Sequence, residues 1–173
     1  DGSGLKRITE GGKENNRLSG WSGRLVRYSS NRRTPEALDA YVYDCEAGKT
    51  RRVAANPGIG TLTDVSRDGK RALVSRLVSR GDNDLFLIDL ATGKEELLTP
   101  HEPPGTFGGG RFSPDGTTVY FTSNKDRDTI TFVRTALGPD GKPGPVKQLT
   151  LRDEAEVEAF EINEQGTAAA VLF

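Results

Sequence analysis

Short apolar runs separated by glycine-containing turns follow one another along the chain, and this pattern returns at nearly constant spacing. Glycines that open an apolar run stand at Gly23, Gly69, Gly116 and Gly166, with spacings of 46, 47 and 50 residues. Apolar runs of about four to eight residues bounded by turn residues are typical of strands. The spacing therefore predicts an internal repeat built of short strands.

Two further landmarks keep the same period. The stretch DAYVYDCEAGKT (39–50) matches DLFLIDLATGKE (84–95), and a short strand-like segment closes each unit, at 5–9, 50–53, 95–99 and 146–150. Each unit reads as four strands; in the second unit they are expected at 61–66, 70–77, 84–90 and 95–98. Four strands in a repeat of about 40 to 50 residues are the signature of a β-propeller blade.

The middle strands of the repeat, such as 85–88, are apolar on both faces, as expected where a blade packs between two neighbours. We therefore expect an all-β chain forming a partial β-propeller of four-stranded antiparallel blades. It has three complete blades, a preceding outer strand and half of a following blade. The expected parts are 1–9 (outer strand), 17–54, 61–99 and 107–150 (blades), and 157–173 (half blade).

Two segments depart from the simple repeat. GPDGKPGP (138–145) lengthens the last turn of the third unit, and its Pro and Gly residues predict a protruding hairpin tip. DEAEVEAFE (153–161) is compatible with a turn of helix, but alignment on Gly166 places Phe160 and Ile162 in an inner strand, which we favour.

Composition narrows the classes of partner. The 24 basic and 25 acidic residues give a net charge of -1, which argues against nucleic acid because a polyphosphate partner needs a basic face. No run of 18 apolar residues exists, so we expect no membrane span. The single cysteine, Cys45, fits a reducing compartment, and we expect a cytoplasmic protein, with the periplasm as the alternative. The chain has no Met, and we expect it to be part of something larger.

Catalytic chemistry is not found in the sequence. GWSGR (20–24) has the wrong spacing for a nucleophile elbow, and Ser113 and Asp115 of FSPDG are interpreted as turn residues. With one His and one Cys, a zinc site is not expected, and no cofactor is indicated. His101 is interpreted as a solvated loop residue, with a channel or interface contact as the alternative; Cys45 is interpreted as a small buried residue.

The repeats resemble the propeller half of the prolyl oligopeptidase family of serine peptidases, in particular its acylaminoacyl-peptidase and dipeptidyl-peptidase-like branch. The resemblance covers nearly the whole chain and rests on four stretches: YSSNRRTPEALDAYVYDCEAGKTRRV (28–53), LTDVSRDGKRALVSRLVSRGDNDLFLIDLATGKEELLTP (62–100), RFSPDGTTVYFTSNKD (111–126) and EVEAFEINEQGTAAAVLF (156–173). In the last stretch, 163–166 read Asn-Glu-Gln-Gly where the family has Ser-Pro-Asp-Gly. Propellers of the Tol system share several of these elements.

The resemblance implies a ring of blades joined to an α/β-hydrolase domain that carries the catalytic triad; no position of this chain matches the triad motifs. The propeller would then control the access of short peptides to that domain, its partner within the parent protein, and a homo-oligomer is possible. Asp64, Arg111 and Glu161 share one aligned position, five residues before the turn glycine, and are expected to line the channel. They could orient a peptide terminus, or be merely solvated. The alternative function is a non-enzymatic, Tol-system-like propeller that binds proteins.

Overall fold

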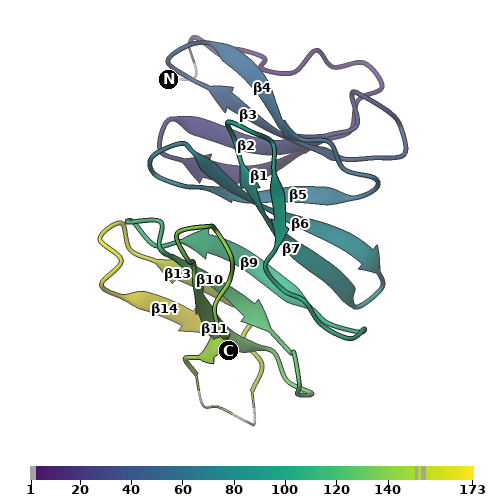
Figure 1. Cartoon of the computed structure of the whole chain (residues 1–173). Helices are drawn as coiled ribbons and strands as arrows, with labels where there is room; N and C mark the ends of the chain where they lie inside the picture. The colour runs from purple at the N-terminus through teal and green to yellow at the C-terminus, as the bar shows by residue number, and fades with distance from the viewer. Residues whose placement is uncertain (1–2, 151, 153–154) are drawn as a thin grey trace.

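The computed structural model describes residues 3–150, 152 and 155–173, and within them every regular element is a β-strand. The strands form three four-stranded sheets and one two-stranded sheet, in each of which neighbours in sequence pair antiparallel. The sheets stack along the molecule like adjacent blades (Figure 1). The predicted all-β fold of four-stranded antiparallel blades is confirmed. Because no helix occurs in the described residues, they contain none that could cross a membrane.

The three complete blades and the half blade follow the chain in order. The first blade contains β1 (Asn16–Ser22), β2 (Leu25–Ser30), β3 (Asp39–Asp44) and β4 (Lys49–Ala54). The second contains β5 (Gly60–Val65), β6 (Arg71–Ser79), β7 (Asp82–Asp89) and β8 (Glu95–Leu97). The third contains β9 (Phe107–Phe112), β10 (Thr118–Ser123), β11 (Thr131–Ala136) and β12 (Lys147–Gln148). The half blade contains β13 (Ala159–Ile162) and β14 (Ala169–Leu172).

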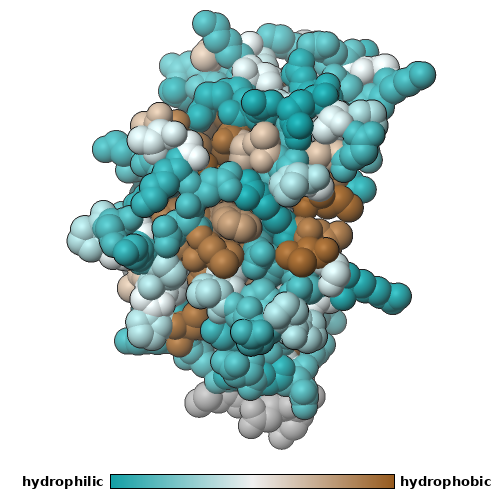
Figure 2. All heavy atoms as spheres, turned by 45° about the vertical axis from the view of Figure 1, so that its right-hand side comes forward, coloured by the Kyte–Doolittle hydropathy of each residue, from teal (hydrophilic) through white to brown (hydrophobic). Residues whose placement is uncertain are grey.

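The hydrophobic core lies between the blades, as the two-faced apolar strands predict. One cluster joins the first and second blades around Val42, Leu62 and Val74. A second joins the second and third blades and contains Leu85 and Phe121, both almost fully buried. On the face that Figure 2 shows, apolar side chains gather in separate patches divided by hydrophilic residues. The blades are therefore held together mainly by apolar burial between sheets.

The innermost strand of each complete blade carries a β-bulge. In β1 and β5 the ladder skips Ser19 and Thr63, so that Gly20 and Asp64 pair with Arg27 and Leu73 of the next strand. The ladder between β9 and β10 shifts in the same way just before Arg111. A bulge bends the strand and changes the direction of the next side chain. These bulges decide what points into the centre of the fragment.

The Ser-x-Asp-Gly segments form tight turns, as predicted. Ser113 Oγ donates to Asp115 Oδ1 (2.6 Å), and the N–H groups of Thr117 and Thr118 donate to Asp115 Oδ1 and Ser113 Oγ. The hydrogen bonds from Ser113 and Thr117 lower the pKa of Asp115. In the half blade, Asn163 Oδ1 alone accepts the two equivalent N–H groups (2.9 and 3.0 Å), which explains how the turn forms without Ser and Asp.

Several expectations need correction. Residues 5–9 form no strand; instead Ile8 packs on a tyrosine cluster of the first blade, because the described chain offers these residues no neighbouring strand of their own blade. Cys45 is exposed rather than buried, since it lies in the turn after β3. The 138–145 hairpin forms, but its Gly141 lies against Leu87 of the second blade. Of the segment 153–161, the strand at 159–161 is confirmed, while 153 and 154 lie outside the described residues.

Buried aspartates hold the linkers between blades. Asp39, at the start of β3, has a side chain with 0% exposure; it accepts two hydrogen bonds from the Arg33 guanidinium (2.6 and 2.9 Å) and one from the Asn56 N–H (2.8 Å). Burial opposes ionisation of this carboxyl, but the Arg33 and Asn56 hydrogen bonds outweigh it, and the pKa of Asp39 lies below its usual value. Asp39 thereby joins β3 to the segment leading into the second blade.

His101 belongs to the corresponding linker between the second and third blades, and it is not the solvated residue that the sequence favoured. Its side chain is buried, with Nε2 2.9 Å from Asp82 Oδ1 and Nδ1 2.8 Å from the Thr99 carbonyl oxygen. Asp82 also accepts the Gly105 N–H. Both ring nitrogens thus face acceptors, an arrangement that the doubly protonated imidazolium satisfies.

We expect this linker to lose stability as the pH rises. Burial opposes the charge on His101, but Asp82, Thr99 and the nearby Asp84 outweigh it and raise the pKa of the imidazole. A raised pKa means that the contribution is complete below about pH 6.5 and is lost as the pH passes the folded-state value. The His101 hydrogen bond, followed by that of Gly105, lowers the pKa of Asp82, so the aspartate's contribution is present above about pH 3.9 and is lost on acidification.

The measurement is the free energy of urea unfolding from pH 5.5 to 9, for the wild type and His101→Gln. The wild type should lose its advantage over the variant as the pH rises. A constant difference between the two proteins across this range would contradict the proposed imidazolium.

Candidate functional site

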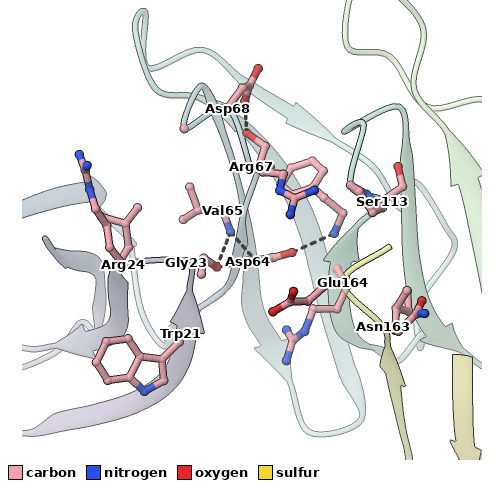
Figure 3. Close-up of a pocket in the computed structure, with 18 of the residues that line it drawn as sticks. Trp21, Gly23, Arg24, Asp64, Val65, Arg67, Asp68, Ser113, Asn163 and Glu164 are labelled. Atoms are coloured by element: carbon pink, nitrogen blue, oxygen red, sulfur yellow. Dashed lines mark hydrogen bonds between the residues drawn. The ribbon is translucent and has the colours of Figure 1, made fainter. Parts of the chain in front are cut away.

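The three predicted channel residues meet at one cleft. They occupy equivalent positions on the innermost strands: Asp64 on β5, Arg111 on β9 and Glu161 on β13. Their partners on the adjacent strands are Leu73, Tyr120 and Ala170, respectively. All three line a cavity of about 770 Å³ at the ends of the innermost strands (Figure 3). In Figure 3, Asp64 lies between the side of the cleft that carries Trp21 and the side that carries Asn163 and Glu164.

The first blade contributes a residue that alignment on the turn glycine missed. Its equivalent inner position is Gly20, which pairs with Arg27, and a Cβ atom at Gly20 would lie 3.1 Å from Arg27 Nη2. Arg27 therefore fills this place from the adjacent strand. The missed signal was a lone arginine in the otherwise buried strand LVRYSS (25–30).

Arg27 is buried, with 3% exposure, and donates to the carbonyl oxygens of Trp21 (3.0 Å) and Leu62 (3.4 Å). Burial, followed by the charge of Arg111, lowers its pKa to about 10, while Asp64 and Glu161 act in the opposite direction. At neutral pH the guanidinium stays charged. The charged side chains at the inner positions, with Arg27 standing in from β2 for Gly20, thus alternate in sign from blade to blade: Arg27, Asp64, Arg111, Glu161.

The hydrogen bonds of the Asp64 carboxylate join the second blade to its two neighbours. Its Oδ1 accepts from Ser22 Oγ of the first blade (2.7 Å) and from its neighbour Val65 N–H (2.8 Å). Its Oδ2 accepts from the Phe112 N–H of the third blade (2.9 Å). This carboxylate is therefore neither merely solvated nor free for a ligand; it bridges three blades at the floor of the cleft.

Arg111 and Glu161 retain binding capacity. Arg111 Nη1 donates to the carbonyl oxygens of Thr63 (2.5 Å) and Gly110 (3.2 Å), which orients the guanidinium and leaves its other N–H groups without a partner among the described residues. Glu161 is exposed and makes no hydrogen bond or ion pair within the described chain. Trp21, 60% exposed, adds an aromatic surface to the cleft lining. The cleft thus offers a cation, an anion and an apolar face.

Among the residues that the structure describes, the cleft contains no serine beside a histidine and no metal centre. Three serines line the cleft: Ser22 donates to Asp64, and Ser66 and Ser113 are used in turns. The single histidine, His101, is not beside them, since it lies at the linker. Within the described residues, no group of His, Cys, Asp and Glu could hold a metal ion. The side chains that line the cleft can bind and orient a ligand.

Comparison with known proteins places the fold. No family model matches the chain. The Tol-Pal system protein TolB of Wolinella succinogenes is 30% identical over 83 residues, which are 48% of this chain and 19% of that protein. The chain thus spans about a fifth of the relative it matches.

The solved structures that resemble this chain include propellers of peptidases and propellers of TolB. A prolyl endopeptidase structure matches 91% of this chain and 26% of its own, with a TM-score of 0.66 and 14% identity. TolB from Acinetobacter baumannii matches 80% of this chain and 33% of its own, with a TM-score of 0.52 and 23% identity. The β-propeller domain of the Trilobed protease from Pyrococcus furiosus matches 78% and 43%, with a TM-score of 0.53 and 16% identity. At these identities the likeness shows the fold alone: the chain is a β-propeller segment, similar to propellers of peptidases and of TolB.

Proposed function

We propose that this propeller segment binds short peptides in its central cleft, as the access-controlling part of a prolyl-oligopeptidase-type serine peptidase. The catalytic α/β-hydrolase domain of that peptidase is not contained in this chain. Arg111 binds the carboxylate at one peptide terminus, Glu161 binds the ammonium group at the other, and Trp21 contacts apolar peptide side chains. The parent protein is proposed to be cytoplasmic.

The observation that carries the proposal is the pair of oppositely charged, incompletely satisfied side chains, Arg111 and Glu161, at one cleft. A peptide presents the complementary charges at its termini, and charge-assisted hydrogen bonds to them are stronger than neutral ones. The partial satisfaction of Arg111 by Thr63 and Gly110 fixes its direction in advance, which reduces the entropy cost of binding.

Replacement of Arg111 by alanine is expected to weaken the binding of peptides with a free carboxyl terminus about tenfold, the loss of one charge-assisted hydrogen bond. Carboxyl-amidated peptides should bind equally to both proteins. Isothermal titration calorimetry on matched free and amidated peptides measures this. Arg134→Ala, an exposed arginine on β11 outside the cleft, is the control. Equal losses for both kinds of peptide would refute the assigned role of Arg111.

The enzymatic part of the proposal has a separate test. The intact parent protein should react with a fluorophosphonate probe, which labels activated serines. An unlabelled, folded parent would exclude the peptidase, whatever the cleft binds.

A second function, protein binding by a non-enzymatic propeller, is favoured by the 30% identity with a TolB protein over 83 residues. A periplasmic location would accompany it. The two functions differ in the ligand of the cleft. If the segment is a protein-binding propeller, an intact folded protein should bind at the cleft and a short peptide should not. An unlabelled parent that retains high affinity for a folded partner would favour this alternative.

A further inference from the structure

The innermost strand of the first blade exposes two large apolar side chains, Leu18 (72%) and Trp21 (60%). Leu18 pairs with Tyr28 and Trp21 pairs with Val26, so both lie on the face of the blade that points away from the second blade. Ile8 packs against the buried tyrosines of this face but leaves the innermost strand exposed. The face is therefore only partly covered by the described chain.

The other blades show what covers the same positions elsewhere in the molecule. In β5 the equivalent side chains are Leu62 and Val65, which stand on either side of the same bulge and are 0% and 5% exposed. They are buried because they pack against the first blade. In β9 the equivalent of Trp21 is Phe112, which is buried against the second blade. Leu18 and Trp21 thus occupy positions that this fold buries against another blade.

The half blade leaves the complementary face open at the other end of the molecule (Figure 1). Ala170 pairs with Glu161 as Leu73 pairs with Asp64, and Leu73 is fully buried beneath the third blade. Ala170 is exposed, and Leu172, on the same side of β14, is 59% exposed. The half blade therefore presents the surface onto which the innermost strand of a further blade packs.

The charges at the inner positions fit a contact between these two ends. They run from Arg27 in the first blade to Glu161 in the half blade and alternate in sign. A second copy placed after the half blade would set its Arg27 next to Glu161, so the alternation would continue. Contact between two first blades or two half blades would bring like charges together. Charge complementarity therefore favours contact between unlike ends.

We propose that the exposed face of the first blade packs on the half blade of a second copy, and that two copies close head to tail into one ring. Together they supply six complete blades and two half blades, which lies within the range of about four to eight blades in known propellers. A contact between unlike faces closes into a ring or continues as a fibre, and closure covers both faces in both copies.

Trp21 can take part in this contact and still line the cleft. Val65 and Phe112 already combine the two, since both line the cleft although they are buried between blades. The proposed association does not depend on what the cleft binds.

The test measures the mass of the full chain by size-exclusion chromatography with light scattering, over about a hundredfold range of concentration. At the upper end, the wild type should have twice the 18.7 kDa mass of the chain. Leu18→Glu and Leu172→Glu each place a charge in one of the two faces and should each be monomeric there. The matched control is Leu77→Glu, which changes a half-exposed leucine on β6 outside both faces and should remain dimeric.

Mixing the two monomeric variants tests the head-to-tail arrangement. The mixture should form a dimer, because an unmodified first blade of one copy can then meet an unmodified half blade of the other. Trp21 is the single tryptophan of the chain and gives a second measurement. Its emission should shift to shorter wavelength as the wild type is concentrated and should stay constant in Leu18→Glu.

Four outcomes would overturn the proposal. A wild type that stays monomeric at every concentration would exclude self-association, and a mixture that stays monomeric would exclude contact between unlike ends. Polymers larger than a dimer would contradict ring closure. Loss of the dimer in Leu77→Glu would show a general effect of surface charge. Circular dichroism checks that each variant is folded, and Leu18→Ser or Leu172→Ser, which add no charge, replace a variant that is not.

Discussion

Replacing Asp39 by alanine is expected to lower the free energy of unfolding by about 3 kcal/mol, the cost of breaking a buried charge pair. The substitution removes the acceptor of the Arg33 guanidinium and leaves the buried Asn56 N–H without its partner. Arg33 is 37% exposed and regains some hydration, which keeps the loss at the lower end of the known range. Urea unfolding followed by tryptophan fluorescence measures the effect.

Two companion variants test this explanation. Asp39→Asn retains one oxygen acceptor for the Asn56 N–H and should recover about half of the loss. Asp44→Ala, at the opposite end of the same strand, removes a turn aspartate that accepts the Glu46 and Ala47 N–H groups and should destabilise the protein much less than Asp39→Ala. If Asp44→Ala were as destabilising as Asp39→Ala, the hydrogen bonds of Asp39 with Arg33 and Asn56 would have no special importance for stability.

The blades could be predicted from the sequence because each one repeats the same local rules. Glycine turns, apolar runs and Ser-x-Asp-Gly segments recur at fixed spacing, so an error in one copy is corrected by the others. In the second unit, the expected strand at 84–90 overlaps β7 (Asp82–Asp89) with a shift of two residues at its start. Residues 5–9 resembled a closing strand but form none, because strand formation also requires a neighbour, which local pattern does not reveal.

The cleft was only partly predictable. Asp64, Arg111 and Glu161 were identified from alignment because the turns of the last three units share one length. The first blade closes its β1–β2 turn differently, with Ser22 pairing directly with Leu25, so counting back from Gly23 reaches Leu18 and misses Gly20. A side chain that crosses from the adjacent strand, as Arg27 does, can be located only when the register is known.

The sequence also did not show which polar side chains are exposed to solvent. Sequence alone did not distinguish a free carboxylate from one that joins blades, and Asp64 belongs to the second kind because Ser22 and Phe112 come from separate blades. The same holds for His101: a histidine among prolines was expected in solvent, yet Asp82 and Thr99 bury it. Hydrogen bonds between distant repeats decide both cases, and they leave no local pattern.

Arg27 should show the second large effect, because it is buried and its charge interacts with those of Arg111, Asp64 and Glu161. Arg27→Ala is expected to lower the free energy of unfolding by about 3 kcal/mol, since it leaves a cavity and frees the carbonyl oxygens of Trp21 and Leu62. Arg27→Leu fills most of the volume, and replacement of a buried charge by an apolar side chain costs less, so about 1 kcal/mol is expected. The exposed Arg17→Ala is the control and should stay within about 0.5 kcal/mol.

Peptide binding separates the electrostatic effect of Arg27 from its packing. Loss of this cation changes the balance of the four inner positions from neutral to negative, so both Arg27 variants should bind peptides with a free carboxyl terminus more weakly and amidated peptides unchanged or more tightly. Arg27→Leu is the informative case because its fold is nearly intact. If it bound both kinds of peptide as the wild type does, Arg27 would act only in joining the first two blades, and the alternating charges would have no part in ligand selection.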